Sequence, residues 1–307
     1  MIEYDWSKNI DDVIGSVKCD KNYRILVPVV NQAELFEKCV SKCEDKSSLV
    51  VVNNFWNKNV HEQCLKLREQ GAEVHDFLGD NRGCAGSWNF GLKHFDTSKI
   101  DFVIILSPSV YFLNKIEDMA DAINNYKGLP PLYYSSVAFK TDNAGYHAFA
   151  IPRSTFDVVG YFDGNMYPVY DEDADYNYRL GLYQKLVYNN DTTKYAICAS
   201  LRVPRTDAGF VRSLSNAAVE WHYTYCIRIK MAYWQKKWGS GPGTRKYMVP
   251  FNMESDPWKA IKYCEPRDPN YPKITDAPQR VIDDKSVQKC VQSLEFWEKQ
   301  FGNLIWK

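Results

Sequence analysis

Several features are missing from this sequence, and each absence excludes a class of protein. No apolar run in the 307 residues approaches the roughly 20 residues of a membrane-spanning helix. The 38 basic and 38 acidic side chains cancel, so no net field draws the chain to nucleic acid or to a membrane surface. The first residues have neither the basic nor the apolar region of a signal peptide, so we expect none.

Paired cysteines are also missing. The nine cysteines are an odd number and none stands in a C-x-x-C pair, which argues against a zinc site and favours a reduced chain. We therefore expect a soluble, intracellular, cytoplasmic protein.

Short apolar runs alternate with segments of helical spacing in the first part of the chain. Runs that are apolar on both faces and alternate with helices predict a mostly parallel sheet covered by helices on both sides. The strands are expected at 23–30, 47–54, 72–79 and 101–107, and the helices between them at 33–43, 60–71 and 86–95.

The later part of the chain has a different character. Strands are expected at 131–140 and 145–153, antiparallel at the sheet edge or in a small second sheet, and helices at 171–186, 217–239 and 285–301. We predict an α/β domain over residues 1–200 and a helical, aromatic-rich extension over 201–307 that serves as an acceptor side or a lid.

Polar residues follow the predicted parallel strands. Ligands of such sheets bind beyond the carboxyl ends of the strands, so these side chains are candidates for a site. They are Asn31, Asn53, Asn54, Asp80, Asn81, Ser107 and Ser109.

Five carboxylates crowd into the thirteen residues from Asp163 to Asp175. Like charges at this density are costly unless something uses them. One explanation is a helix N-terminus, where acids are favoured and Asp175 pairs with Arg179. The other is a general base at the mouth of a cleft. The stretch alone favours the first.

Five segments in order resemble the family-2-type glycosyltransferases of the GT-A fold, in the rhamnosyltransferase-like branch. They are "ILVPVVNQAELFEKCVSK" (25–42), "VVVNNFWN" (50–57), "DNRGCAGSWNFGL" (80–92), "DFVIILSPSV" (101–110) and "HAFAIPRSTFDVVGYFDGNMYPVYDEDADYNYRL" (147–180). Each segment is a weak match alone, and their order makes the match specific. The resemblance covers roughly residues 23–186.

The resemblance implies an inverting hexosyl- or pentosyltransferase, which moves a sugar from a nucleotide-sugar to a hydroxyl of a glycan or another acceptor. It assigns Asp173 as the base that deprotonates the acceptor, with Glu172 and Asp175 orienting the acceptor or the helix. Asp163 is expected to cap the following turn.

The resemblance also implies a set of donor-binding residues. The loop Pro28, Val29 and Asn31, together with Asn53 and Asn81, is expected to line the nucleotide, although Asn53 replaces the aspartate usual in the family. Gly83, Gly86 and Gly91 either let the backbone approach the donor or are turn and helix-packing glycines. Asn89 is expected to fix the turn.

The family commonly holds a divalent metal with an aspartate at the place of Ser109. Here "SPS" (107–109) offers Ser107 and Ser109 and no carboxylate, and a hydroxyl is a poor ligand for a hard cation. We expect no required cofactor and at most a weak dependence on Mn²⁺ or Mg²⁺.

Another cation would then have to meet the leaving diphosphate. Residues 201–250 hold nine basic and two acidic side chains, which is either a solvated basic face or a cationic clamp. The clamp candidates are His222, Arg205, Arg245 and Lys246. The segment 236–251 is either a lid with glycine hinges or a linker.

Two alternatives stay open. Lysines and arginines interleaved with aromatic residues also suit nucleic acid, so the acceptor could be a modified base in DNA. The missing aspartate would also fit a catalytically inactive protein that binds nucleotide or glycan on the same scaffold.

Overall fold

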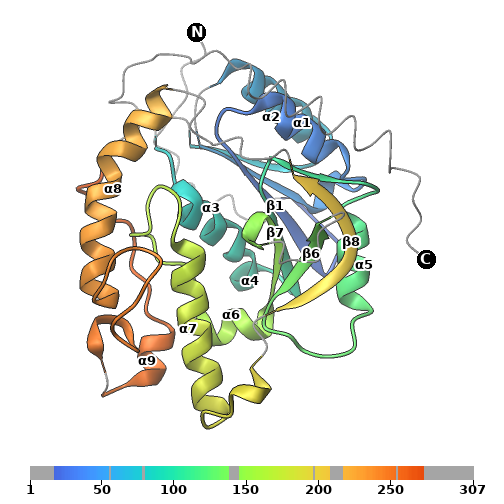
Figure 1. Cartoon of the computed structure of the whole chain (residues 1–307). Helices are drawn as coiled ribbons and strands as arrows, with labels where there is room; N and C mark the ends of the chain where they lie inside the picture. The colour runs from blue at the N-terminus through green and yellow to red at the C-terminus, as the bar shows by residue number, and fades with distance from the viewer. Residues whose placement is uncertain are drawn as a thin grey trace.

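The computed structural model describes residues 17–54, 57–77, 80–137, 145–195, 198–207, 217–253 and 255–272. One mixed sheet runs through it in the order β3-β2-β1-β4-β7-β6-β8-β5 (Figure 1). The strands are β1 (Tyr23–Val29), β2 (Leu49–Asn53), β3 (Glu73–Asp76), β4 (Phe102–Leu106), β5 (Val110–Phe112), β6 (Tyr133–Val137), β7 (Ala148–Pro152) and β8 (Ala199–Asp207). The predicted α/β class is confirmed.

The four early strands pair in parallel, as their apolar runs predict. β7 then joins β4 antiparallel, and β6 and β8 continue the same sheet. The residues expected at 131–140 and 145–153 therefore extend the main sheet and do not form a second one. β8 crosses the domain boundary predicted after residue 200, so we propose that the extension begins after this strand.

Helices cover both faces of the sheet (Figure 1). On one face lie α1 (Ala33–Ser41), α2 (Lys58–Glu69) and α5 (Glu117–Asn124). On the other lie α3 (Gly83–Leu92), α4 (His94–Thr97), α6 (Arg153–Val159), α7 (Glu172–Val187) and α9 (Pro257–Ile261). The long α8 (Ala217–Trp238) lies beside α7. The helix expected at 285–301 lies outside the described residues.

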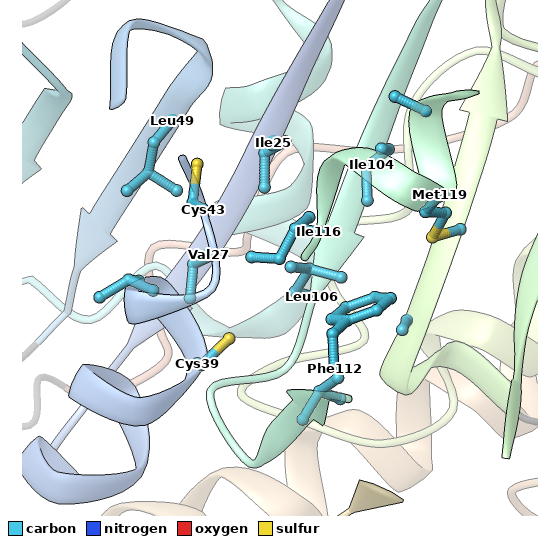
Figure 2. Close-up of a cluster of buried hydrophobic side chains, with 14 of the residues drawn as sticks. Ile25, Val27, Cys39, Cys43, Leu49, Ile104, Leu106, Phe112, Ile116 and Met119 are labelled. Carbon is cyan, nitrogen blue, oxygen red and sulfur yellow. The ribbon is translucent and has the colours of Figure 1, made fainter. Parts of the chain in front are cut away.

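Each early strand contributes alternate side chains to two cores. Ile25 and Val27 of β1 pack under α1 and α5 with Cys39 and Phe112 (Figure 2), whereas Leu26 between them belongs to the core on the α3 side. Because both faces are buried, the strand reads as an unbroken apolar run.

The carboxyl ends of the parallel strands meet at one edge of the sheet. The last residue pairs of β1 with β2 and of β2 with β3 are Val29 with Asn53 and Asn53 with Asp76. The pairing of β4 with β1 runs in the same direction and brings the loop after Leu106 to that edge. The fold thus collects the polar residues that follow these strands.

Two further findings concern the predicted setting of the protein. Within the described ranges, no helix combines the length and the apolar composition that crossing a membrane requires. The cysteines in those ranges are free thiols, and the buried ones, such as Cys39 and Cys64, serve as apolar core residues.

Gly91 allows α3 to pack closely on β1, which gives a test of the fold. A Cβ at Gly91 would lie 2.5 Å from Cδ2 of the buried Leu26, whereas a Cβ at Gly181 in α7 would meet nothing within 4 Å. We expect Gly91→Ala to lower the free energy of unfolding by about 1–3 kcal/mol through overpacking. Gly181→Ala, the matched helical control, should leave it unchanged or raise it by up to about 1 kcal/mol. Urea unfolding measures both, and equal effects would contradict the packing.

Candidate functional site

Two buried asparagines end β2 at the carboxyl edge. Asn53 Nδ2 donates to Asp76 Oδ1 (2.8 Å), so this predicted donor residue joins β2 to β3. Asn54 Oδ1 accepts from the Arg82 backbone N–H (2.9 Å), and its Nδ2 donates to Ser87 Oγ (2.9 Å). Asn54 therefore fastens the first turn of α3 to the end of the strand.

The loop after β1 is only partly available to a ligand. Val29 is fully buried in the core, and its carbonyl accepts from the Asn54 backbone N–H (2.9 Å). Pro28 is half-buried in the strand, and Asn31 lies just beyond it with 7% of its surface exposed. Of the three predicted residues, Asn31 keeps a polar side chain beyond the strand end.

The turn at the start of α3 is held by the protein itself. Asn81 Oδ1 accepts from the Gly83 N–H (2.9 Å), and the Asn81 carbonyl accepts from the Tyr167 hydroxyl (2.9 Å) and from Arg267 Nη1 (2.6 Å). Gly83 has φ +68°, and a Cβ there would lie 2.6 Å from the Pro168 carbonyl oxygen. The close approach at Gly83 is therefore to the Pro168 backbone and the Tyr167 ring.

The structure also places the other glycines and Asn89 of this region. Gly91 lies against Leu26, so it is a helix-packing glycine, while Gly86 lies in the first turns of α3. Asn89 exchanges two hydrogen bonds with the Phe162 backbone, at 2.8 and 2.7 Å. It therefore anchors α3 to the segment before the carboxylates and does not fix the 80–86 turn.

The serine pair after β4 does not form a metal site. Ser107 Oγ and Ser109 Oγ lie 2.9 Å apart in a mutual hydrogen bond, and the Ser107 N–H donates to the His147 carbonyl (2.7 Å). Hard divalent cations prefer carboxylate oxygens. The described ranges also contain no group of three or more His, Cys, Asp and Glu arranged to hold a metal. The residues present do not fit the family's cation.

The first carboxylate of the cluster is a structural residue. Asp163 Oδ1 accepts from the Asn165 N–H (2.9 Å), so Asp163 caps its turn as predicted. Its Oδ2 accepts from Lys237 Nζ (2.6 Å) and from the Tyr233 hydroxyl (2.7 Å) of α8. Asp163 and Lys237 are both fully buried.

Asp175 is the second structural carboxylate. Its oxygens meet Lys237 Nζ (2.7 Å), Arg179 Nε (3.0 Å) and Trp238 Nε1 (2.9 Å). Burial by itself raises the pKa of Asp175, but the charges of Lys237 and Arg179 hold it below the ordinary aspartate value. Asp175 therefore orients α7 from inside the protein, and no exposed surface of it is left for an acceptor.

The third carboxylate with a cation is Asp171, immediately before α7. Its Oδ2 lies 2.7 Å from Nζ of Lys230, a second lysine of α8 with a buried side chain. Lys230 and Lys237 stand seven residues apart, about two helical turns, and therefore share one face of α8.

The remaining two carboxylates, Glu172 and Asp173, lie in different environments. Glu172 is 5% exposed, and burial followed by the Asp173 charge raises the pKa of its carboxyl to about 8. It also hydrogen-bonds the Cys84 thiol in the first turn of α3. Asp173 is half-buried, and its Oδ1 accepts from the Ala174 N–H (2.8 Å). Burial raises the pKa of Asp173 as well, in part offset by backbone hydrogen bonds.

One predicted clamp residue lies at the serine end of the sheet. Arg205 on β8 pairs in register with Phe112, the last residue of β5, and it is fully buried. Burial lowers the pKa of His147, and the Arg205 charge lowers it further. Burial lowers the pKa of Arg205 to about 10, so it stays a cation at neutral pH.

The other clamp candidates lie elsewhere. His222 is fully buried, and its Nε2 lies 2.9 Å from the Tyr167 hydroxyl and 2.8 Å from the Pro272 carbonyl oxygen. Arg245 stacks over the Tyr178 ring at 4.5 Å, about one and a half turns along α7 from its first residue. Lys246 follows it in the loop after α8. The structure does not bring these three to the serine pair.

The loop between α8 and Pro250 is fastened to the two long helices. Tyr178 donates to the Gly243 carbonyl (2.8 Å), and Trp234 Nε1 donates to the Thr244 carbonyl (2.8 Å). The Lys246 N–H donates to the Trp238 carbonyl (2.7 Å). The predicted lid is thus bonded beside the middle of α7, away from Asp173 at its start.

Part of the basic excess of residues 201–250 is buried and unavailable to nucleic acid. Three of its nine basic side chains, Arg205, Lys230 and Lys237, are buried, and the two lysines are bonded to the carboxylates before and within α7. Phosphates can be contacted only by exposed cations. We therefore do not retain DNA as a partner.

Sequence reasoning missed four residues of this region: Cys84, Lys230, Lys237 and Arg267. The spacing of the two lysines along α8 is the one signal that was available, because residues seven apart on a helix share a face. Arg267 reaches Asp80 and Asn81 from far along the chain, and no local pattern marks it.

Comparison with known proteins gives distant structural matches. No family model matches the sequence, and no curated protein matches it at a significant level. The solved structures that match include S. aureus TarS 1–349 in complex with UDP, at 15% identity and a TM-score of 0.40, over 52% of this chain and 55% of that one. Against a second TarS structure, this chain covers 33% of the other's length.

Two other matches cover more of the chain. Mannosyltransferase PcManGT from Pyrobaculum calidifontis, in complex with GDP-Man and Mn²⁺, matches at 13% identity and a TM-score of 0.45, over 72% of this chain and 66% of that one. Glucosyl-3-phosphoglycerate synthase from Mycobacterium tuberculosis, in complex with Mg²⁺ and UDP, matches at 10% identity and 0.42, over 72% and 83%.

The buried bonds of Asp175 predict a stability effect that depends on pH. Asp175→Asn leaves Lys237 and Arg179 short of a buried counter-charge, and we expect a loss of about 3 kcal/mol or more at pH 7. Because the folded pKa is depressed, the native Asp175 contribution is full above about pH 3.9 and is lost as the pH falls below it. The variant should therefore show a flatter loss of stability in acid.

Urea unfolding between pH 2.5 and 7 measures this effect. Asp20→Asn is the control, because its side chain is 87% exposed and an exposed ion pair contributes little. A variant at Asp175 as stable as this control would contradict the structural role.

Proposed function

We propose that this protein is an inverting glycosyltransferase that moves a hexosyl or pentosyl group from a nucleotide-sugar to an acceptor hydroxyl, with Asp173 as the general base. One observation carries the proposal. Of the five clustered carboxylates, three contact lysine and Glu172 is buried, so Asp173 alone is half-exposed with no described cation bonded to it.

The chemistry requires a carboxylate beside the attacking oxygen. Asp173 accepts the proton of the acceptor hydroxyl, that oxygen bonds to the anomeric carbon, and the bond from this carbon to the diphosphate oxygen breaks on the opposite face. The new bond therefore has inverted configuration. Asp173 lies in the first turn of α7, where the helix dipole favours its negative form.

The Glu172–Asp173 pair suits a single base. Two carboxylates in adjacent positions resist ionising together, so the more buried one holds the proton. Burial raises the pKa of Glu172 to about 8, which leaves it neutral at pH 7 beside its neighbour. Different environments thus give two adjacent acids different roles.

The donor is proposed to lie along the carboxyl edge of the sheet. Asn31, Asn81 and the serine pair are the polar groups there, and the first turn of α3 connects them to Glu172 through Cys84. We assign the positive charge for the leaving diphosphate to Arg205, a buried cation that acts through its charge and not by direct contact, in place of a metal.

A second function is favoured by one observation. The mutual hydrogen bond of Ser107 and Ser109 occupies the place where the family's metal ligand is expected. A non-catalytic protein that binds nucleotide or glycan on this scaffold would also tolerate that change. Turnover separates the two functions.

Asp173→Asn tests the base directly. We expect kcat to fall by about 10²–10⁴-fold, the range for loss of a general base, while donor affinity and Tm stay close to wild type. Asp157→Asn, on the exposed face of α6, is the matched control and should keep full activity. Sugar transfer is followed by nucleotide release, and a variant at Asp173 that turns over normally would remove this residue from the chemistry.

Metal dependence is tested with a panel of UDP-, GDP-, dTDP- and CMP-sugars. We expect one nucleotide class to raise Tm, equally in EDTA and in Mn²⁺, because a ligand that binds the folded state stabilises it. A rate that collapses in EDTA and returns with Mn²⁺ would contradict the metal-free site. Binding without turnover for every donor would favour the non-catalytic function.

A further inference from the structure

Lys230 is a buried cation bonded to the segment from which the base emerges. Its Nζ lies 2.7 Å from Asp171 Oδ2 and donates to the carbonyl oxygens of Val169 (3.0 Å) and Tyr170 (3.2 Å). These three partners are consecutive residues, and the side chain of Lys230 is 2% exposed. An ammonium has three donors, and the two carbonyls and the carboxylate match them in number.

The segment that Lys230 holds has an unusual backbone. Tyr170 and Asp171 are both in the left-handed region at φ 72°, which is costly for residues other than glycine. This pair sets the direction in which α7 begins, and Asp173 stands two residues further on. The bonds from Lys230 fix both carbonyls of the turn, so they fix the first turn of the helix.

Lys230 also belongs to the charged groups around Asp173. Asp171 and Glu172, which precede Asp173 in the chain, are its acidic neighbours. The charge of Asp173 also raises the pKa of the Cys84 thiol on α3. The Asp173 charge likewise raises the pKa of Tyr134 on β6 and of Tyr146 before β7. Among these titratable groups, Lys230 is the cation.

We propose that Lys230 is a positioning residue for the base: it holds the turn that orients Asp173. The inference rests on the proposed role of Asp173 and assigns part of the working site to α8. Lys237, two turns along the same helix face, contacts Asp163 and Asp175 and anchors α7 further from its start. The two lysines thus have different roles.

The direct effect of the Lys230 charge agrees with the geometry. Burial raises the pKa of Asp173, and the Asp171 charge raises it further, whereas the Lys230 charge lowers it. Removing the lysine and removing the aspartate should therefore move the titration of Asp173 in opposite directions. A purely structural ion pair would give both variants the same loss and no change in titration.

The test compares Lys230→Met with Asp171→Asn. In Lys230→Met, we expect the acidic limb of the kcat/KM profile to move to higher pH by about one unit, as loss of a nearby opposite charge commonly does. In Asp171→Asn, the acidic limb should move to lower pH. Asparagine suits this position because it tolerates the left-handed backbone. Lys236→Met, an exposed neighbour of Lys237, is the control and should leave the profile in place.

A second readout does not depend on activity. Titration of the ¹³C carboxyl resonance of Asp173, assigned through Asp173→Asn, reports the same opposite shifts in the two variants. If no sugar transfer is found but the resonance shifts as expected, the proposed function fails and the effect of Lys230 stands. Profiles and resonances that stay in place in both variants would overturn the inference. If Lys230→Met does not fold, Lys230→Gln takes its place in the same comparison with Asp171→Asn.

Discussion

The rest of the structure depends on one set of ion pairs. Two lysines on one face of α8 pair with carboxylates that lie before α7 and in its first turn. Five acids within thirteen residues repel one another, and burying any of them without a partner is costly. Lys237 neutralises Asp163 and Asp175, and Lys230 neutralises Asp171. The extension after the sheet is therefore part of the same folded unit as the site.

This pairing also makes the five acids unequal. Those that contact lysine are fixed in place, and Glu172 is withdrawn from solvent beside Cys84. Asp173 is left half-buried, with no lysine among its described contacts. Different environments thus distinguish acids that are neighbours in the sequence, as the proposed role of Asp173 requires.

Polar side chains at the carboxyl edge of the sheet are likewise bonded within the protein. Asn54, Asn81 and Asn89 each bind backbone or side chains of other elements, so they build the edge before any ligand reaches it. The serine pair bonds to itself and offers no carboxylate to a cation. The cation assigned to this end of the sheet, Arg205, comes from β8. This strand lies far from β4 in the sequence, and β7 and β6 lie between the two strands in the sheet.

The sequence by itself determined the parallel half of the sheet and led to the proposal for Asp173. Strands buried on both faces must be apolar runs, and the ordered motifs marked the first turn of α7. Only the tertiary structure decided the rest. β8 carries Arg and Pro among its apolar residues and was not predicted, and the roles of Asn89 and Lys230 come from partners 73 and 61 residues away. The physical reason is that local patterns record which face of an element is buried, whereas hydrogen bonds and ion pairs are made between elements that only the folded chain brings together.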